Sequence, residues 1–82
     1  MIVFKHQNED DEIRVCFPRR GIKHWIIDVY YVTIRDMDQY KFDTRGEADH
    51  FFKLLLEHYS ENSYDAVQTI EERDYRGVGF GG

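Results

Sequence analysis

Nine of the fourteen residues 23–36 are β-branched residues, Tyr or Trp, the types that fit a pleated and half-buried surface. Successive residues of a strand point to opposite faces, and here both sets of alternate positions are apolar. They are Trp25, Ile27, Val29 and Tyr31 on one face, and Ile26, Tyr30, Val32 and Ile34 on the other. Because both faces are apolar, we expect a long strand inside a sheet, with a neighbouring strand on each side.

Shorter alternating patterns predict further strands over residues 2–6, 13–17 and 40–43. Polar residues 7–12 form the first connection, Pro18 ends the second strand, and an Asp-rich turn over residues 36–39 forms the last connection. Strands that follow one another after such short connections are most simply antiparallel neighbours. The sequence therefore predicts a four-stranded antiparallel meander.

The segment after residue 43 carries the pattern of a capped amphipathic helix. Thr44 can accept a hydrogen bond from the Glu47 amide while Glu47 reaches back to the Thr44 amide, which is the capping-box pattern. Apolar residues then recur at helical spacing up to Tyr59. We expect a long helix over residues 44–59 that lies across one face of the sheet.

The last quarter of the chain is ambiguous between helix and strand. Ser63 is a favourable N-cap, and the apolar residues behind it share one side at helical spacing, so we assign residues 64–75 to a short C-terminal helix. A fifth, edge strand over residues 66–71 is the alternative. Residues 77–82 are glycine-rich and are expected to form a flexible tail. The predicted fold is a single α+β domain over residues 1–76.

Charge and composition exclude several classes of function. With 11 basic and 16 acidic residues the formal net charge is −5, so we expect no direct nucleic-acid partner, because phosphate binding needs a cationic face. Cys16 is the only cysteine and cannot form an internal disulfide, which fits a reducing cytoplasm. Neither a signal peptide nor a membrane span of about 20 apolar residues is visible, so the sequence predicts a cytoplasmic location.

The residue types that carry catalysis or bind metals do not form a recognisable site. His50 and His58 are eight positions apart on the predicted helix, whereas ligands on adjacent turns are four apart. Neither Cys16 nor a serine stands in a pattern that pairs it with a histidine for nucleophilic attack. The sequence therefore predicts no catalytic residue, no metal and no cofactor.

Asp28 is the unusual carboxylate of the sequence. It lies in the middle of the long strand, between Ile26 and Tyr30 on the same face, where a charge needs a partner or water. We expect an ion pair with Arg14 or Lys41 across the sheet, or a local opening of that face to a partner.

The turns of the predicted meander separate positive from negative charge. The first and third turns of a meander lie at one end of the sheet, and the second lies at the other. This places Arg19, Arg20 and Lys23 opposite to an acidic set, which comprises Glu9, Asp10, Asp11, Glu12, Asp36 and Asp38. Dense carboxylates can imitate a row of phosphates and occupy a basic groove of another protein. A solvated turn without a partner is the alternative interpretation.

The aromatic content, 16% of the chain, exceeds what one helix can cover on a small sheet. Tyr and Trp are frequent anchors of protein interfaces, and Tyr30 and Tyr40 are our candidate anchors beside the acidic set. A homodimer formed through the open face of the sheet would cover the same residues.

The order of elements, with strands over residues 25–34 and 40–43 followed by the capped helix over residues 44–59, resembles that of small acidic phage-encoded inhibitors of host defence, the anti-CRISPR type. The resemblance covers size, charge and element order, and no motif carries over. It implies a non-enzymatic protein that binds a nuclease or effector complex.

Two alternatives from other classes stay open. A small RNA-acting enzyme of toxin type would use Arg19, Arg20 and Lys23 to bind phosphate, and a histidine such as His24 for acid–base catalysis. A homo-oligomeric accessory protein would use the apolar face of the sheet for self-association.

Overall fold

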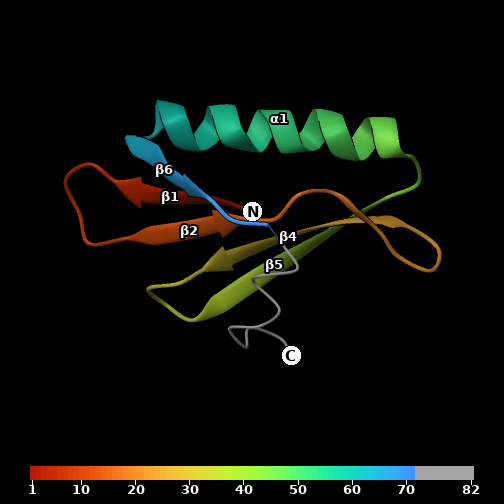
Figure 1. The fold of residues 1–82 in the computed structure, drawn as a ribbon, viewed down its shortest axis with the longest axis horizontal. Coiled ribbons are helices and arrows are strands. Elements are labelled where there is room, and N and C mark those ends of the chain that lie inside the picture. The colour runs from red at the N-terminus through yellow and green to blue at the C-terminus, as the bar shows by residue number, and fades with distance from the viewer. Residues whose placement is uncertain (72–82) are drawn as a thin grey trace.

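The computed structural model describes residues 1–71, which form an α+β fold with one antiparallel sheet and one helix (Figure 1). The strands are β1 (Ile2–His6), β2 (Glu12–Val15), β3 (Arg19–Arg20), β4 (Trp25–Tyr31), β5 (Asp36–Phe42) and β6 (Tyr64–Thr69). The helix α1 (Arg45–Glu61) connects β5 to β6.

The apolar strand β4 lies inside the sheet, as its two apolar faces predict. β5 pairs with its whole length, from Trp25–Phe42 to Tyr31–Asp36. A strand has two edges, so the other partners, β2 and β3, share the second edge of β4. The order across the sheet is therefore β5, β4, β2, β1 and β6, with β3 beside the start of β4. The predicted meander corresponds to β1, β2, β4 and β5.

An extra residue near Pro18 separates β2 from β3. Val15 pairs with Val29, and Arg19 pairs with Ile26. The segment from Val15 to Arg19 is therefore one residue longer than the part of β4 that lies opposite it. Proline cannot donate to the ladder, and a bulge is one of the places where a sheet tolerates it. The shift places Arg19 on the same face of the sheet as Ile26 and Asp28.

The boundary between β4 and β5 differs from the prediction. β4 ends at Tyr31, the turn occupies residues 32–35, and the expected turn over residues 36–39 is wrong because these residues begin β5. Arg35 adopts a left-handed conformation with φ of 55°, which reverses the chain before β5. The first four residues of β5 are exposed, so no apolar alternation marks them as a strand.

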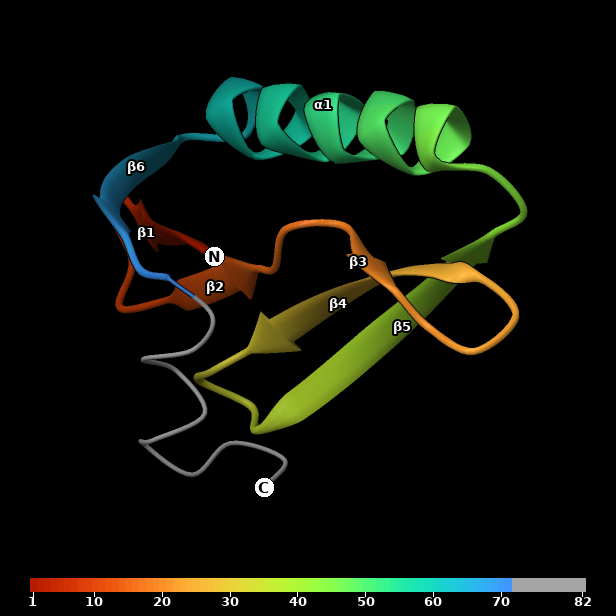
Figure 2. The ribbon, with the colours of Figure 1, turned by 45° about the vertical axis from the view of Figure 1, so that its right-hand side comes forward.

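Helix α1 lies on the Trp25 and Ile27 face of the sheet (Figures 1 and 2). Its N-terminus is capped as expected, since the Glu47 amide donates to Thr44 Oγ1 at 3.2 Å. The Glu47 carboxylate accepts from the Thr44 hydroxyl at 2.9 Å, whereas the capping box predicted the Thr44 amide. The buried core between helix and sheet comprises Phe4, Ile13, Val15, Ile27, Val29, Ala48 and Tyr59.

The segment after α1 is a strand and not the expected helix. Ser63 takes a left-handed conformation with φ of 68° and ends α1, so it is not the N-cap of a second helix. Residues 64–69 then pair with β1 as β6, and the Ile70 amide donates to the Met1 carbonyl at 2.8 Å. The strand alternative, placed over residues 66–71, begins two residues later than β6. The remainder of the predicted helix and the predicted tail over residues 77–82 lie outside the described residues.

Candidate protein-binding surface

The two acidic turns of the sheet lie at the same end of the molecule, on the left of Figure 1. They are joined directly, because the Val32 amide donates to the Glu12 carbonyl at 3.0 Å and the Glu12 amide donates to Thr33 Oγ1 at 3.3 Å. We call this region the acidic end and define it by Glu9, Asp10, Asp11, Asp36 and Asp38. The structure thus brings all six predicted acidic residues to one end. Glu12 is left out of the definition because basic side chains engage its carboxylate, as described below.

Asp11 is held by the last strand of the described chain. The Tyr64 hydroxyl donates a hydrogen bond to Asp11 Oδ2, and the Tyr64 ring contacts the His6 ring edge-on at 4.9 Å between centroids. The hydrogen bond to the carboxylate, together with partial burial, raises the pKa of Tyr64 to about 12. Tyr64 was not among the predicted anchors, because its position depends on the pairing of β6 with β1.

Asp38 is held by two tyrosines on the helix side of the sheet. The Tyr31 hydroxyl donates to Asp38 Oδ2 at 2.7 Å, and the Tyr40 hydroxyl lies 3.5 Å from the same oxygen. Burial and the Asp38 carboxylate raise the pKa of Tyr31 well above its usual range. Tyr40, a predicted anchor, therefore lies at the acidic end, and its ring packs against Phe51 of α1 at 4.8 Å.

The loop that presents Glu9 and Asp10 is shaped by His6. Its Nδ1 accepts hydrogen bonds from the amides of Asn8 and Glu9, at 3.1 and 3.0 Å. The Asp11 amide closes the turn by donating to the Glu9 carbonyl at 3.0 Å. A side-chain acceptor that binds successive amides replaces the missing strand partners of this loop. His6 therefore has a structural role here, and sequence patterns gave no sign of it.

Glu12 lies at the same end through its backbone, but its carboxylate is paired with basic side chains. Its carboxylate accepts from Arg14 Nε at 2.7 Å and lies 3.9 Å from Lys5 Nζ. Asp36 remains at the acidic end, but its Oδ1 accepts from the Met37 amide at 2.8 Å and so supports the turn. The side chains of Glu9 and Asp10 are exposed and form no such contact within residues 1–71.

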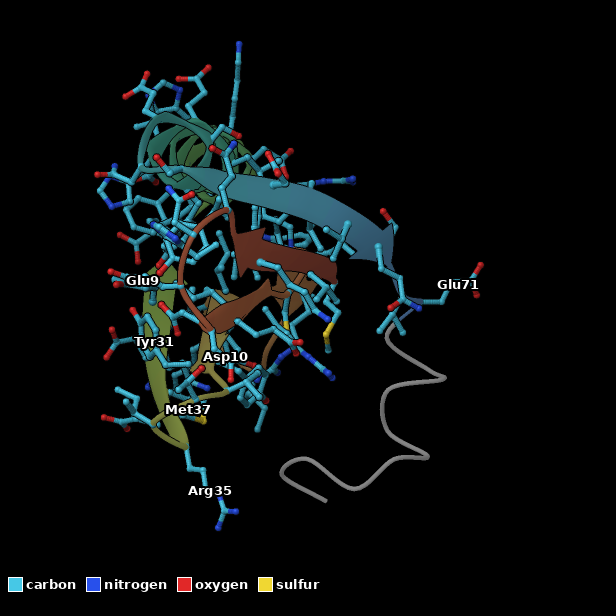
Figure 3. The ribbon with its side chains drawn as sticks, turned by 90° about the vertical axis from the view of Figure 1, so that its left-hand side faces the viewer. Glu9, Asp10, Tyr31, Arg35, Met37 and Glu71 are labelled. Carbon is cyan, nitrogen blue, oxygen red and sulfur yellow. The ribbon has the colours of Figure 1, made fainter. Side chains whose placement is uncertain are left out.

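Figure 3 looks onto the acidic end. It shows Glu9 and Asp10 on the first turn, and Tyr31, Arg35 and Met37 around the second turn. Arg35, at the tip of that turn, projects away from Glu9, and Met37 is 40% exposed. The acidic end therefore combines exposed carboxylates with an exposed apolar side chain and tyrosine hydroxyls.

Tyr30, the other predicted anchor, lies on the opposite face of the sheet. It is half-buried against a small cluster formed by Met1, Val3 and Cys16. The structure therefore does not bring Tyr30 together with Tyr40 on one surface, because the two residues come from opposite faces of paired strands.

Asp28 pairs with Arg19 and not with the expected Arg14 or Lys41. Its Oδ2 lies 3.2 Å from Arg19 Nη2, and its Oδ1 accepts from Gln39 Nε2 at 2.9 Å. Asp28 is 6% exposed, so this ion pair compensates a buried charge. The bulge at Pro18 explains the partner, since it turns Arg19 onto the Asp28 face.

The loop between β3 and β4 lies at the other end of the sheet, on the right of Figure 1, and brings basic residues to that end. The loop after β3 (Figure 2) and the adjoining strands line an open cavity of about 430 Å³, which we call the basic cavity. It is lined by Arg19, Lys23, His24 and Lys41 together with Ile22 and Ile26. Arg20 does not line it, because its guanidinium lies 5.8 Å from the Trp25 ring, which also contacts Arg45 at 5.6 Å.

Residues 1–71 contain no group of three or more His, Cys, Asp or Glu side chains arranged to hold a metal ion. Helix α1 is not long and apolar enough to cross a membrane.

Comparison of the chain with models of known protein families, with curated protein sequences and with solved structures finds no match.

Proposed function

We propose that the protein is a non-enzymatic inhibitor or adaptor that binds another protein through its acidic end. The observation that carries this proposal is the direct joining of the two acidic turns by hydrogen bonds between Glu12 and residues 32 and 33. This joining fixes carboxylates from two separate turns on one rigid surface. A basic groove, such as the nucleic-acid-binding surface of a cytoplasmic nuclease or effector complex, is the complementary partner.

Helix α1 supports the same separation of positive and negative charge between the two ends of the sheet. Arg45, at its N-terminus, lies beside Trp25 at the basic end, whereas Tyr59, in its last turn, contacts Tyr64 at the acidic end. A helix carries a partial negative charge at its C-terminus, so α1 adds to the negative potential of the acidic end. The charges of the turns and the helix dipole therefore point in the same direction.

The tyrosines at this end supply the second component of an interface. Tyr31 and Tyr40 hold Asp38 while their rings pack against the helix-covered core. Their side chains are already ordered before binding, which lowers the entropy cost of association. Rigid aromatic side chains beside fixed charges are typical of interface anchors.

The experiment that tests this function starts with the immobilised protein and an extract of the cells that produce it. The captured protein is identified by mass spectrometry, purified and titrated with the wild-type chain. We expect wild-type protein to displace nucleic acid from that partner. The double variant Glu9→Lys, Asp10→Lys should weaken binding by at least about tenfold, because it reverses exposed charges that form no contact within residues 1–71.

A matched control separates the acidic end from net charge. Asp49→Lys, Glu57→Lys changes the net charge by the same amount, but on the exposed surface of α1. This variant should bind within about twofold of wild type, because it leaves the two turns unchanged. Equal binding by the Glu9, Asp10 variant and wild type would remove the acidic end from the interface and would contradict the proposal.

A second candidate function is favoured by the basic cavity, where His24 lies beside Arg19, Lys23 and Lys41. Cationic side chains with a histidine are the groups that an RNA-cleaving enzyme would use. An RNA cleavage assay with wild type and His24→Ala tests this candidate. Cleavage that His24→Ala abolishes would replace the binding function by a catalytic one.

A further inference from the structure

We propose that the basic cavity is a binding site for a small organic phosphate. The site lies at the opposite end of the sheet from the acidic end and is independent of the protein-binding function proposed for that end. It is the same cavity that the second candidate function, RNA cleavage, would use.

The charge of the cavity lining is unusual for this chain. The chain as a whole has 16 acidic and 11 basic residues, yet the lining contains Arg19, Lys23, His24 and Lys41 and no carboxylate. Lys23 and Lys41 are exposed and form no ion pair with a residue of the described chain. Two uncompensated lysines on one cavity create a positive potential that attracts an anion.

Asp28 and Asp43 are the carboxylates near the cavity, and neither cancels the lysines. Asp28 binds Arg19 through Nε and Nη2, at 3.4 and 3.2 Å, which leaves the donors of Arg19 Nη1 outside that contact. Asp43 lies 3.9 Å from His24 Nε2 and is 88% exposed at its side chain. The fixed Arg19 fork and the two flexible lysines therefore resemble the combination that proteins use for phosphate.

The loop around the cavity is held in a defined shape. The Gly21 amide donates to the His24 carbonyl at 2.8 Å, which closes a tight turn. A Cβ atom at Gly21 would lie 2.7 Å from Ile26 Cδ1 and 3.0 Å from the His24 oxygen, so a larger residue here would require the Ile26 side chain and the turn to shift. The backbone of the site is thus ordered without a ligand.

The size and the apolar walls of the cavity favour an organic phosphate over the free ion. Its volume of about 430 Å³ falls within the range of small-molecule sites, about 300 to 1,000 Å³. Ile22 is 98% exposed beside the cations, and Ile26 forms part of the same wall. An exposed isoleucine next to cations suits a ligand with an anionic group and an apolar part.

Nucleic acid fits the site less well than a small molecule. A polyanion extends beyond one cavity, and this chain carries a net charge of −5 with an acidic end on the same sheet. Repulsion from the remaining surface opposes a long phosphate backbone, whereas a single phosphate group contacts the cavity alone.

Calorimetric titration of the full chain at low salt tests the site with adenosine monophosphate and phenyl phosphate. Adenosine and inorganic phosphate serve as reference compounds. We expect at least one phosphate ester to bind about tenfold or more tightly than adenosine, because the lysines act on the phosphate, and more tightly than inorganic phosphate, because the isoleucines act on the organic part.

Two charge-matched variants locate the binding. Lys23→Gln, Lys41→Gln should weaken binding of the phosphate ester by about tenfold or more, whereas Lys5→Gln, Lys53→Gln, with the same net charge, should leave it within about twofold. Thermal melting of both variants verifies that they fold. The site is refuted if neither ester binds, if adenosine binds equally well, or if the two variants behave alike. Tighter binding of a single-stranded RNA that depends on Lys23 and Lys41 would reassign the site to RNA.

Discussion

The Tyr64 hydroxyl donates a hydrogen bond to the carboxylate of Asp11, a residue 53 positions earlier in the chain. The contact joins the start of β6 to the end of the first acidic turn. The contact depends on the protonation state of Tyr64, since only the neutral phenol can donate this hydrogen bond. Ionisation of Tyr64 would therefore release Asp11 and the turn that it ends.

We expect the free energy of unfolding to fall as the pH rises above about 10. The Asp11 carboxylate raises the pKa of Tyr64 from its ordinary value of 10.0 to about 12. Between these two values the unfolded chain binds fewer protons than the folded chain, so stability decreases as the pH increases. Chemical denaturation at a series of alkaline pH values, together with the ultraviolet absorbance of tyrosinate, measures this loss. Tyr64→Phe should show a shallower decline, and parallel profiles for the two proteins would contradict the assignment.

His6→Leu should loosen the turn that presents Glu9 and Asp10. The substitution removes the acceptor for the amides of Asn8 and Glu9, and the loss of these bonds should cost about 1 kcal/mol. Hydrogen exchange followed by nuclear magnetic resonance should show faster exchange of both amides. His6→Asn retains a side-chain acceptor and should restore part of the protection. Unchanged exchange in His6→Leu would show that the turn is held by other contacts.

Asp28→Ala should lower the free energy of unfolding by about 2 kcal/mol, because it removes the buried acceptor for Arg19 and Gln39. Arg19→Ala should cost less, since the Arg19 side chain is 40% exposed and Gln39 still binds the carboxylate. A double-mutant cycle measured by chemical denaturation gives the coupling of the two residues. A coupling energy near zero would argue that Asp28 is stabilised without Arg19.

Ser63→Gly should stabilise the protein by up to about 1 kcal/mol. Ser63 has φ of 68° after the last turn of α1, a left-handed conformation that is costly for residues with a Cβ atom. Glycine adopts it without this cost. Thermal melting checks the gain, and Ser60→Gly within α1 is the matched control that should lower the melting temperature. A lower melting temperature for Ser63→Gly would contradict the role of this residue.

The sequence predicts the elements whose signals are local. The two apolar faces of residues 25–31 identify an interior strand, and Thr44 and Glu47 mark the start of the helix. The sequence predicts the strand β6 only as the alternative, because its pairing with β1 joins segments about 60 residues apart, which no local pattern records. A periodicity shared by a few apolar residues then favoured a helix at the same place.

The candidate surface could be predicted in part. Turn order alone brings Asp10 and Asp38 to one end, because it depends only on the meander. The orientation of Glu12 toward Arg14 and the role of Tyr64 depend on strand register and on β6, so they follow only from the structure. The Asp28 partner also depends on register, since one extra residue near Pro18 decides which basic side chain reaches it.

The polar composition of β5 has a consequence for solubility at high concentration. Within the described chain β5 pairs with β4 alone, so its outer backbone groups can accept a further strand from another molecule. Charged side chains on such a margin oppose edge-to-edge addition, and β5 carries Asp36, Asp38 and Lys41. The charged residues that obscure β5 in the hydrophobic pattern are thus ones that oppose the addition of a further strand.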